Sequence, residues 1–386
     1  MLRQVAFYLL LASIFFAPFT PYPVAIFILT CFIIVIINLP KKILTLNLLD
    51  KLQLIYTLWL IPVSCFAVYK GHSFLASLVF VLYLFAYLSA RSLFDSHKFN
   101  LIIKILIITC LFLDFWSILQ SVGLSIKWHN FWILRPRKFP LPLTSLCFNQ
   151  RHFAVFLEFI LPIFLALWFF TKNKYLLILF IVNFLFLILT HERGPFGSTI
   201  VAILVLAGLF KRYKFGITII IVLVLIGLSF RPFRKRLLHT FEQNADIARK
   251  VNIIGGLKMW RDHNIVTGIG VNNYPLLYKQ PKYYDKRVRI LPFVHNLYIS
   301  MLVETGIIGL ILSTILFITF MRWLFYLFKT SKDILKFFYG GLFAAFIGTF
   351  VDNLFDCTPY IIGFGTIYWI FMGIISCEYS RQVQNE

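Results

Sequence analysis

His295 is the residue of this chain whose type and position best fit acid–base chemistry. It stands beside Asn296 at the end of a long polar segment, residues 231–294, where the chain returns to an apolar run. Histidine is the side chain best suited to remove a proton near neutral pH. His295 is therefore the candidate general base for a substrate hydroxyl group, and Asn296 is a secondary candidate beside it.

Two polar segments carry an excess of positive charge. Residues 231–294 hold thirteen Lys or Arg against four acidic residues, and residues 121–151 hold five Lys or Arg with no Asp or Glu. Such an excess is typical either of a solvated surface beside anionic lipid headgroups or of a site for a phosphorylated substrate. We favour the second interpretation, because Arg and Lys stabilise the negative charge that develops on a phosphate leaving group.

Four residues could complete such a site from other parts of the chain. Arg193 ends one apolar run, and because the next run starts at residue 195, its guanidinium group has little loop in which to turn toward solvent. Arg151 lies at the start of another run and could bind phosphate. Asp352 and Asp356 flank the end of a later run, where Asp356 could orient a basic partner or the acceptor.

The composition shows that membrane-spanning helices must position these residues. Hydrophobic residues make up 60% of the 386-residue chain, charged residues only 13%, and the mean hydropathy is +0.85. A soluble domain carries about 25% charged residues, because water covers its surface. Lipid must cover most of this surface instead, so a soluble enzyme is excluded.

Twelve apolar runs have about the length of a membrane span, which is roughly 20 residues for about 30 Å of hydrocarbon. They occupy residues 4–20, 22–39, 52–69, 72–90, 101–122, 152–170, 175–190, 195–210, 216–230, 297–320, 334–351 and 358–377. The sequence predicts an all-α polytopic membrane protein with about twelve transmembrane helices, nine in residues 1–230 and three in residues 295–386. Residues 231–294 form one large loop between them, with short helices.

The charges of the short loops predict the orientation of the helices. If the N-terminus is cytoplasmic, every short loop on the cytoplasmic side carries Lys or Arg, as the positive-inside rule requires. An even number of spans returns the C-terminus to the same side. Both termini are then cytoplasmic, and residues 231–294 face the outside together with His295.

The long loop and the span after it contain a specific order of motifs. A basic pair at 249–250 opens a predicted helix, a Gly-Ile-Gly turn follows at 268–270, and His-Asn-Leu-Tyr at 295–298 precedes Glu-x-Gly-x-x-Gly at 304–309. The glycine turn alone does not indicate a nucleotide site, since no strand precedes it. Together with the Arg-Gly pair at 193–194, this order resembles the O-antigen ligase family of bacterial envelope proteins. The resemblance in architecture covers essentially the whole chain.

The resemblance implies transfer of a glycan from an undecaprenyl diphosphate carrier to a sugar hydroxyl of the lipid A core, at the periplasmic face of the bacterial inner membrane. By the same resemblance, His295 is the catalytic base and Arg193 binds the diphosphate. The family usually has a further arginine where this chain has Lys250, with Arg249 one position earlier. Either Lys250 or Arg249 could be the loop ligand of the diphosphate.

Two other functions remain open beside this inverting glycosyltransferase activity in lipopolysaccharide biosynthesis. An O-antigen polymerase, or another undecaprenyl-diphosphate-dependent O-glycosyltransferase, would differ chiefly in its acceptor. A lipid-linked saccharide transporter is less favoured, because transporters place their ionisable residues near the midplane, often in paired halves. The outward-facing segments lack the carboxylate clusters of metal-dependent glycosyltransferases. We therefore expect no metal, no other cofactor and no nucleic-acid partner.

Overall fold

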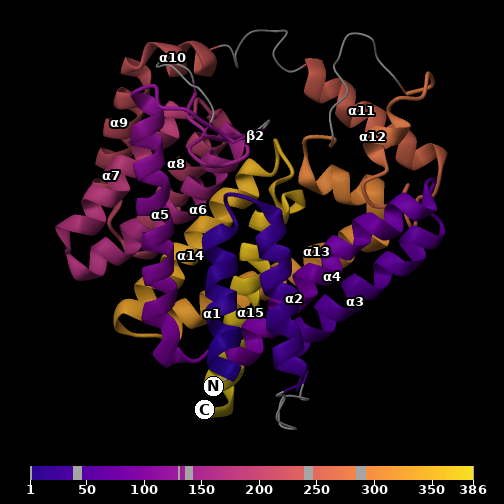
Figure 1. The fold of residues 1–386 in the computed structure, drawn as a ribbon, viewed down its shortest axis with the longest axis horizontal. Helices are drawn as coiled ribbons and strands as arrows, with labels where there is room; N and C mark the ends of the chain where they lie inside the picture. The colour runs from indigo at the N-terminus through magenta and orange to yellow at the C-terminus, as the bar shows by residue number, and fades with distance from the viewer. Residues whose placement is uncertain are drawn as a thin grey trace.

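The computed structural model describes residues 2–37, 46–128, 131–134, 142–238, 247–283 and 293–385. Each predicted apolar run lies on a helix within these ranges (Figure 1). Lipid offers no hydrogen-bonding partners, so a membrane segment must satisfy its own backbone groups, as an α-helix does. The apolar helices are α1 (Leu2–Phe16), α2 (Pro21–Ile37), α3 (Leu48–Cys65), α4 (Lys70–Leu93), α5 (Phe99–Ser121), α6 (Gln150–Thr171), α7 (Lys174–Leu189), α8 (Arg193–Leu209), α9 (Tyr213–Ser229), α13 (Leu297–Thr330), α14 (Asp333–Asp352) and α15 (Ile362–Asn385).

Seven helices of the described chain are long and apolar enough to cross a membrane. Helix α9 and the short α10 (Arg231–Leu238), which meet at an angle of 100°, qualify as an eighth span if they are counted together. Four further apolar helices, α1, α2, α7 and α8, have 15 to 17 residues. At 1.5 Å per residue they are only about 23–26 Å long. The chain is a multi-pass helical membrane protein, and helix length alone supports fewer spans than the predicted twelve.

The long polar segment contains short helices, as predicted. They are α10, α11 (Ile247–Asp262) and α12 (Tyr274–Leu277), while residues 239–246 and 284–292 lie outside the described part of the chain. One element departs from the all-α prediction. Strands β1 (Ile126–Trp128) and β2 (Phe131–Leu134) form an antiparallel hairpin after α5, in a stretch rich in the aromatic and β-branched residues that favour strands.

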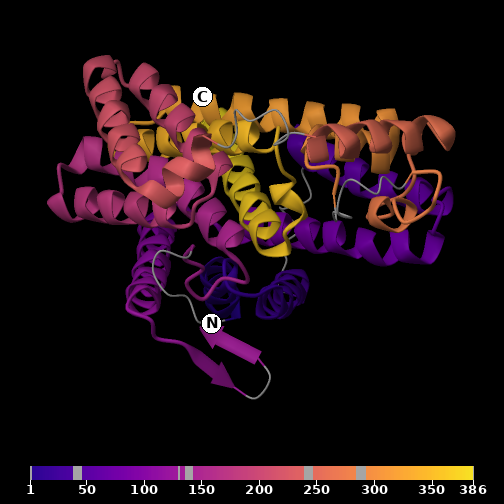
Figure 2. The ribbon, with the colours of Figure 1, turned by 90° about the horizontal axis from the view of Figure 1, so that it is seen from above.

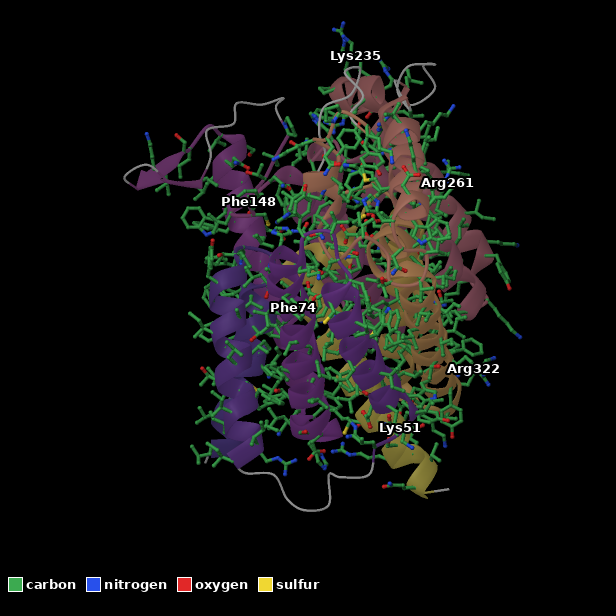
Figure 3. All side chains as sticks on the ribbon, turned by 90° about the vertical axis from the view of Figure 1, so that its right-hand side faces the viewer. Lys51, Phe74, Phe148, Lys235, Arg261 and Arg322 are labelled. Carbon is green, nitrogen blue, oxygen red and sulfur yellow. The ribbon has the colours of Figure 1, made fainter. Side chains whose placement is uncertain are left out.

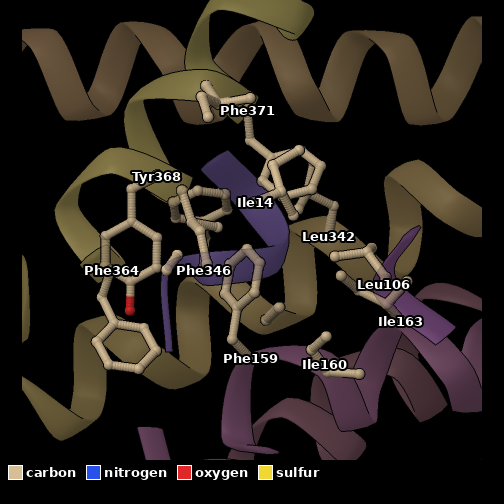
Figure 4. Packing of buried hydrophobic residues seen from close by; sticks show 14 of the residues in the cluster. Ile14, Leu106, Phe159, Ile160, Ile163, Leu342, Phe346, Phe364, Tyr368 and Phe371 are labelled. Atoms are coloured by element: carbon tan, nitrogen blue, oxygen red, sulfur yellow. The ribbon is translucent and has the colours of Figure 1, made fainter. Parts of the chain in front are cut away.

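Helix α6 forms the centre of the core. Most of its side chains are buried, and it packs against α7, α8 and α14. Figure 4 shows Phe159 of α6 beside Phe346 of α14 and Tyr368 of α15, and the ring centroids lie 5.4 and 5.3 Å apart. A side chain at Gly341 of α14 would come within 2.8 Å of the Cα atom of Ile163, so glycine permits the close approach of the two helices. The ends of α6 and α14 carry candidate site residues.

Helix α13 is broken at Gly306, whose φ of 71° lies in the left-handed region. The break leaves carbonyl groups of α13 available, and the predicted glycine turn at 268–270 docks there. The N–H of Ile269 donates to the carbonyl oxygen of Val303 at 2.9 Å, and the N–H of Gly270 donates to the carbonyl oxygen of Glu304 at 3.1 Å. A side chain at Gly306 would overlap with the carbonyl oxygen of Val266. The two glycine motifs therefore form one structural joint between the long segment and α13.

The two termini lie at one end of the molecule, and α10, α11 and α12 lie at the other (Figure 1). Figure 3 places Lys51 and Arg322 near the first end, and Lys235 and Arg261 near the second. The hairpin β1–β2 extends away from the helices (Figure 2). The candidate site lies at the second end, where α6, α8 and α13 begin and α14 ends.

Candidate functional site

Asn296 fixes the start of α13 and thereby the position of His295. Its side-chain oxygen accepts from the N–H of Ile299 at 3.0 Å and caps the helix. Its amide nitrogen donates to the carbonyl of Leu354 at 3.0 Å, in the turn that follows α14. His295 directly before it has a φ of 58°, a left-handed conformation that is uncommon outside glycine. Both polar groups of the Asn296 side chain, the secondary candidate for the site, are thus hydrogen-bonded to the backbone of the protein.

The two ring nitrogen atoms of His295 have different surroundings. Its Nδ1 lies 3.8 Å from Oδ1 of Asp356. Its Nε2 is buried and has no hydrogen-bond partner among the described residues. Burial lowers the pKa of His295, and the nearby Arg249 and Arg151 lower that pKa further, while Asp356 raises it. The ring is therefore neutral near pH 7 and can accept a proton at Nε2.

Arg151 lies in the first turn of α6 and faces three carboxylates. Its Nε is 2.8 Å from Oδ2 of Asp356, its Nη2 pairs with Oδ2 of Asp352, and its Nη1 is 3.9 Å from Oε2 of Glu192. Asp352 is buried, and the guanidinium side chain is 17% exposed. These residues come from α6, the end of α14, the turn after it and the residue before α8.

Arg193, the first residue of α8, is half-buried and directed toward α10. Its Nη1 donates to the carbonyl oxygen of Arg236 at 3.3 Å. Phe233 anchors α10 there, because its ring packs 4.8 Å from that of Phe196 on α8 and is fully buried. The bend between α9 and α10 thus covers the start of α8 with a basic helix.

The two candidate cations of α11 point in different directions. Arg249 is half-buried, and its guanidinium carbon lies 5.5 Å from the ring centroid of Phe355. It is also close enough to His295 to lower the pKa of that residue. Lys250 is exposed. Adjacent residues of an α-helix project about 100° apart, so only one of the two can face the site.

Glu192 was not predicted as a site residue from the sequence, but it lies between the guanidinium groups of Arg151 and Arg236. Its Oε1 accepts from Nε2 of Gln150 at 2.9 Å and lies 3.4 Å from Nη2 of Arg236. The sequence feature that could have indicated a role for Glu192 is its position directly before Arg193, at the end of an apolar run. The structure thus brings His295, Arg249 and Asp356 together with the predicted Arg151 and Asp352, while Lys250 projects away.

An aromatic cavity begins at the first turn of α13, two residues after His295. Its walls come from α3, α4, α13, α14 and α15 and include Tyr298, Phe317, Phe350 and Trp369. The cavity continues from the polar helix ends toward the apolar middle of the helices. Its walls are mostly apolar.

The residues that the structure describes contain no group of three His, Cys, Asp or Glu side chains arranged to hold a metal ion. The polar groups at the site are instead an imidazole, several guanidinium groups and carboxylates. Such a set can exchange a proton and bind an anion without a change of oxidation state.

Residues 176–314 match the family model of the O-antigen ligases. The chain carries an O-antigen ligase domain. The resemblance inferred from the motif order is thereby confirmed. No curated protein matches the chain. The matched O-antigen ligase segment runs from α7 into α13 and contains Arg193, Arg249 and His295, whereas Arg151, Asp352 and Asp356 lie outside it. His295 and the two arginines thus come from the matched segment, and the carboxylate of Asp356 comes from the turn after α14, beyond that segment.

Replacing Gly194 with alanine is expected to lower transfer activity of this O-antigen ligase domain and to destabilise the protein by about 1–3 kcal/mol, as overpacking does. The new Cβ atom would overlap with Oδ1 of Asp352 and lie 3.0 Å from Nη1 of Arg151. Gly197 on the same helix is the matched control, since its Cβ would meet nothing within 4 Å. Thermal unfolding in detergent and transfer assays on both variants test the expectation. Equal behaviour of the two variants would contradict it.

Proposed function

We propose that this protein is a glycan ligase that transfers O-antigen from undecaprenyl diphosphate to a sugar hydroxyl of the lipid A core. The observation that supports it most is the geometry of His295 in the O-antigen ligase domain, with Nδ1 toward Asp356 and Nε2 unpartnered in the described chain. A neutral imidazole with one free nitrogen is what a general base for a hydroxyl group requires.

In the proposed reaction, Nε2 of His295 takes the proton of the acceptor hydroxyl as its oxygen attacks the anomeric carbon. The bond from that carbon to the diphosphate breaks on the opposite side, so the configuration inverts. Arg193 and Arg249 stabilise the charge that develops on the diphosphate, with Lys250 as the alternative loop ligand. A cation fixed beside a leaving group in a water-poor site contributes several kcal/mol, so the reaction needs no metal ion.

The carrier and the acceptor approach from different parts of the site. The aromatic cavity next to His295 would contact a short part of the apolar undecaprenyl chain, because its walls are mostly apolar and extend from the helix ends toward the membrane interior. The phosphorylated lipid A core would contact the basic residues of α10 and α11, which carry an excess of positive charge. Two anionic partners are thus held at one end of the molecule.

The proposed location is the bacterial inner membrane, with both termini cytoplasmic and His295 facing the periplasm. Both termini lie at one end, with basic side chains such as Lys51 and Arg322 near it, which supports this orientation (Figures 1 and 3). Twelve spans remain the proposed number, with α1, α2, α7 and α8 accommodated by local thinning of the bilayer.

Deletion of the gene is expected to leave full-length polymer on the undecaprenyl carrier and lipid A core without attached polymer. Gel analysis of lipopolysaccharide and of carrier-linked glycan measures both products in one strain. Complementation with the wild-type gene should restore attachment, and complementation with His295→Ala should not. Core capped with a single repeat unit would instead identify an O-antigen polymerase and contradict the ligase proposal.

A further inference from the structure

We propose that Arg151 is a positioning residue, whose guanidinium group binds carboxylates of the protein and holds Asp356 against Nδ1 of His295, and that it does not bind the diphosphate. The inference rests on the proposed role of His295 as base. It assigns a role to the charge cluster made of Arg151, Asp352, Asp356 and Glu192, which we call the carboxylate clamp.

The guanidinium group of Arg151 is already surrounded by acids on each of its nitrogen atoms. Nε faces Asp356, Nη2 faces Asp352 and Nη1 faces Glu192. A fourth acid, Glu158, is buried on the same helix two turns away and interacts electrostatically with Arg151. The nearby acids occupy every nitrogen atom of the guanidinium group, so none is left to bind a diphosphate.

Asp356 is fixed on both of its oxygen atoms. Oδ2 lies 2.8 Å from Nε of Arg151, whereas Oδ1 accepts from the N–H of Cys357 at 2.7 Å and faces Nδ1 of His295 at 3.8 Å. A carboxylate on the Nδ1 side of a histidine keeps the proton there and leaves Nε2 as the base. The separation of 3.8 Å exceeds a hydrogen bond, and such contacts often tighten when substrate binds.

The clamp also joins segments that are distant in the sequence. Arg151 opens α6, Glu192 precedes α8, and Asp352 ends α14. Glu158 accepts a hydrogen bond from the hydroxyl of Ser198 on α8 at 2.8 Å. The buried ends of α6, α8 and α14 therefore hold Arg151 rigidly, so that it can fix a carboxylate in a turn that lies outside any helix.

Removal of Arg151 and removal of Asp356 should change the pH dependence of transfer in opposite directions. Asp356 raises the pKa of His295, and Arg151 and Arg249 lower it. Within the clamp, Asp352 and Glu192 also face Arg151, and the titratable or charged groups that lie against the clamp are Glu158, His152 and Arg236. Activity requires neutral His295, so transfer rises with pH through its pKa. Arg151→Gln should move this rise to higher pH, and Asp356→Asn should move it to lower pH.

The test is the pH profile of kcat/KM for purified full-length protein in lipid nanodiscs, with carrier-linked glycan as donor and lipid A core as acceptor. We expect the two variants to shift the acidic limb in opposite directions, with kcat lowered about 10- to 100-fold, as for other residues that orient a functional side chain, and with the KM for the donor unchanged. Arg151→Lys should retain the wild-type limb in part, because it keeps the charge without the planar group.

Two outcomes would overturn the proposal. If Arg151→Gln raises the KM for the donor and leaves the limb in place, Arg151 is a diphosphate ligand. If neither variant moves the limb, the clamp only supports the fold. If Arg151→Gln does not fold, Asp356→Asn still tests the proposal through the shift of its acidic limb. This variant should fold, because it keeps the ion pair between Arg151 and Asp352. Failure of the proposed function itself would be seen in a different variant, because His295→Ala would then keep the turnover of the wild type.

Discussion

Replacing His295 with alanine is expected to lower the turnover of glycan transfer by about 10²–10⁴-fold, the usual contribution of a general base. The variant should still fold and insert, because α13 is capped by Asn296 and not by the histidine. Alanine can adopt the left-handed φ of position 295 only at some cost, so His295→Asn is a useful companion, since asparagine tolerates this region. Turnover of purified protein with carrier-linked donor and lipid A core measures the effect.

The matched control is His97→Ala. His97 is exposed in the short turn before α5, and its backbone N–H contacts Asp95. This variant removes a histidine without touching α13 or the clamp, so its turnover should equal that of the wild type. If His295→Ala and His295→Asn also keep near wild-type turnover, His295 is not the base and the proposed mechanism is wrong.

Arg249→Ala is expected to lower turnover by about 10²–10³-fold, as removal of one preorganised donor does in other transfer enzymes, whereas Lys250→Ala should have little effect. Arg249 is half-buried beside Phe355 and close to His295, while Lys250 is exposed. The two variants each remove one positive charge from adjacent positions of α11. The comparison therefore separates a directed contact with the diphosphate from a general loss of basic charge.

Arg249→Lys should give an intermediate activity, because lysine keeps the charge but lacks the planar fork that binds two oxygens at once. Steady-state kinetics with the carrier-linked donor measures all three variants. A larger loss in Lys250→Ala would make Lys250 the ligand, as its position in the motif order suggests. Equal and mild losses would mean that neither side chain contacts the diphosphate.

Several features of the fold follow from the sequence because they depend on local composition. An apolar run in lipid has no alternative to an α-helix, so the helices lie where the runs are. The number of spans was harder to predict, since the shortest runs give helices of 15 to 17 residues. The motif order in 249–309 and the Arg-Gly pair at 193–194 identified the family, which the match over residues 176–314 confirms.

Other features depend on which helix ends meet, and no local pattern encodes that. The contact between the glycine turn at 268–270 and the break at Gly306 could not be predicted from the sequence, because the turn bonds to Val303 on another element. Basic charge alone left Arg249 and Lys250 equivalent until the direction of α11 was known. The sequence predicts a phosphate ligand at Arg151 because the segment that it ends, residues 121–151, has no Asp or Glu, whereas packing of α6 against α8 and α14 places acids around it. Residue types thus determined the chemistry that is possible here, and the long-range packing of helix ends decided which residues could share it.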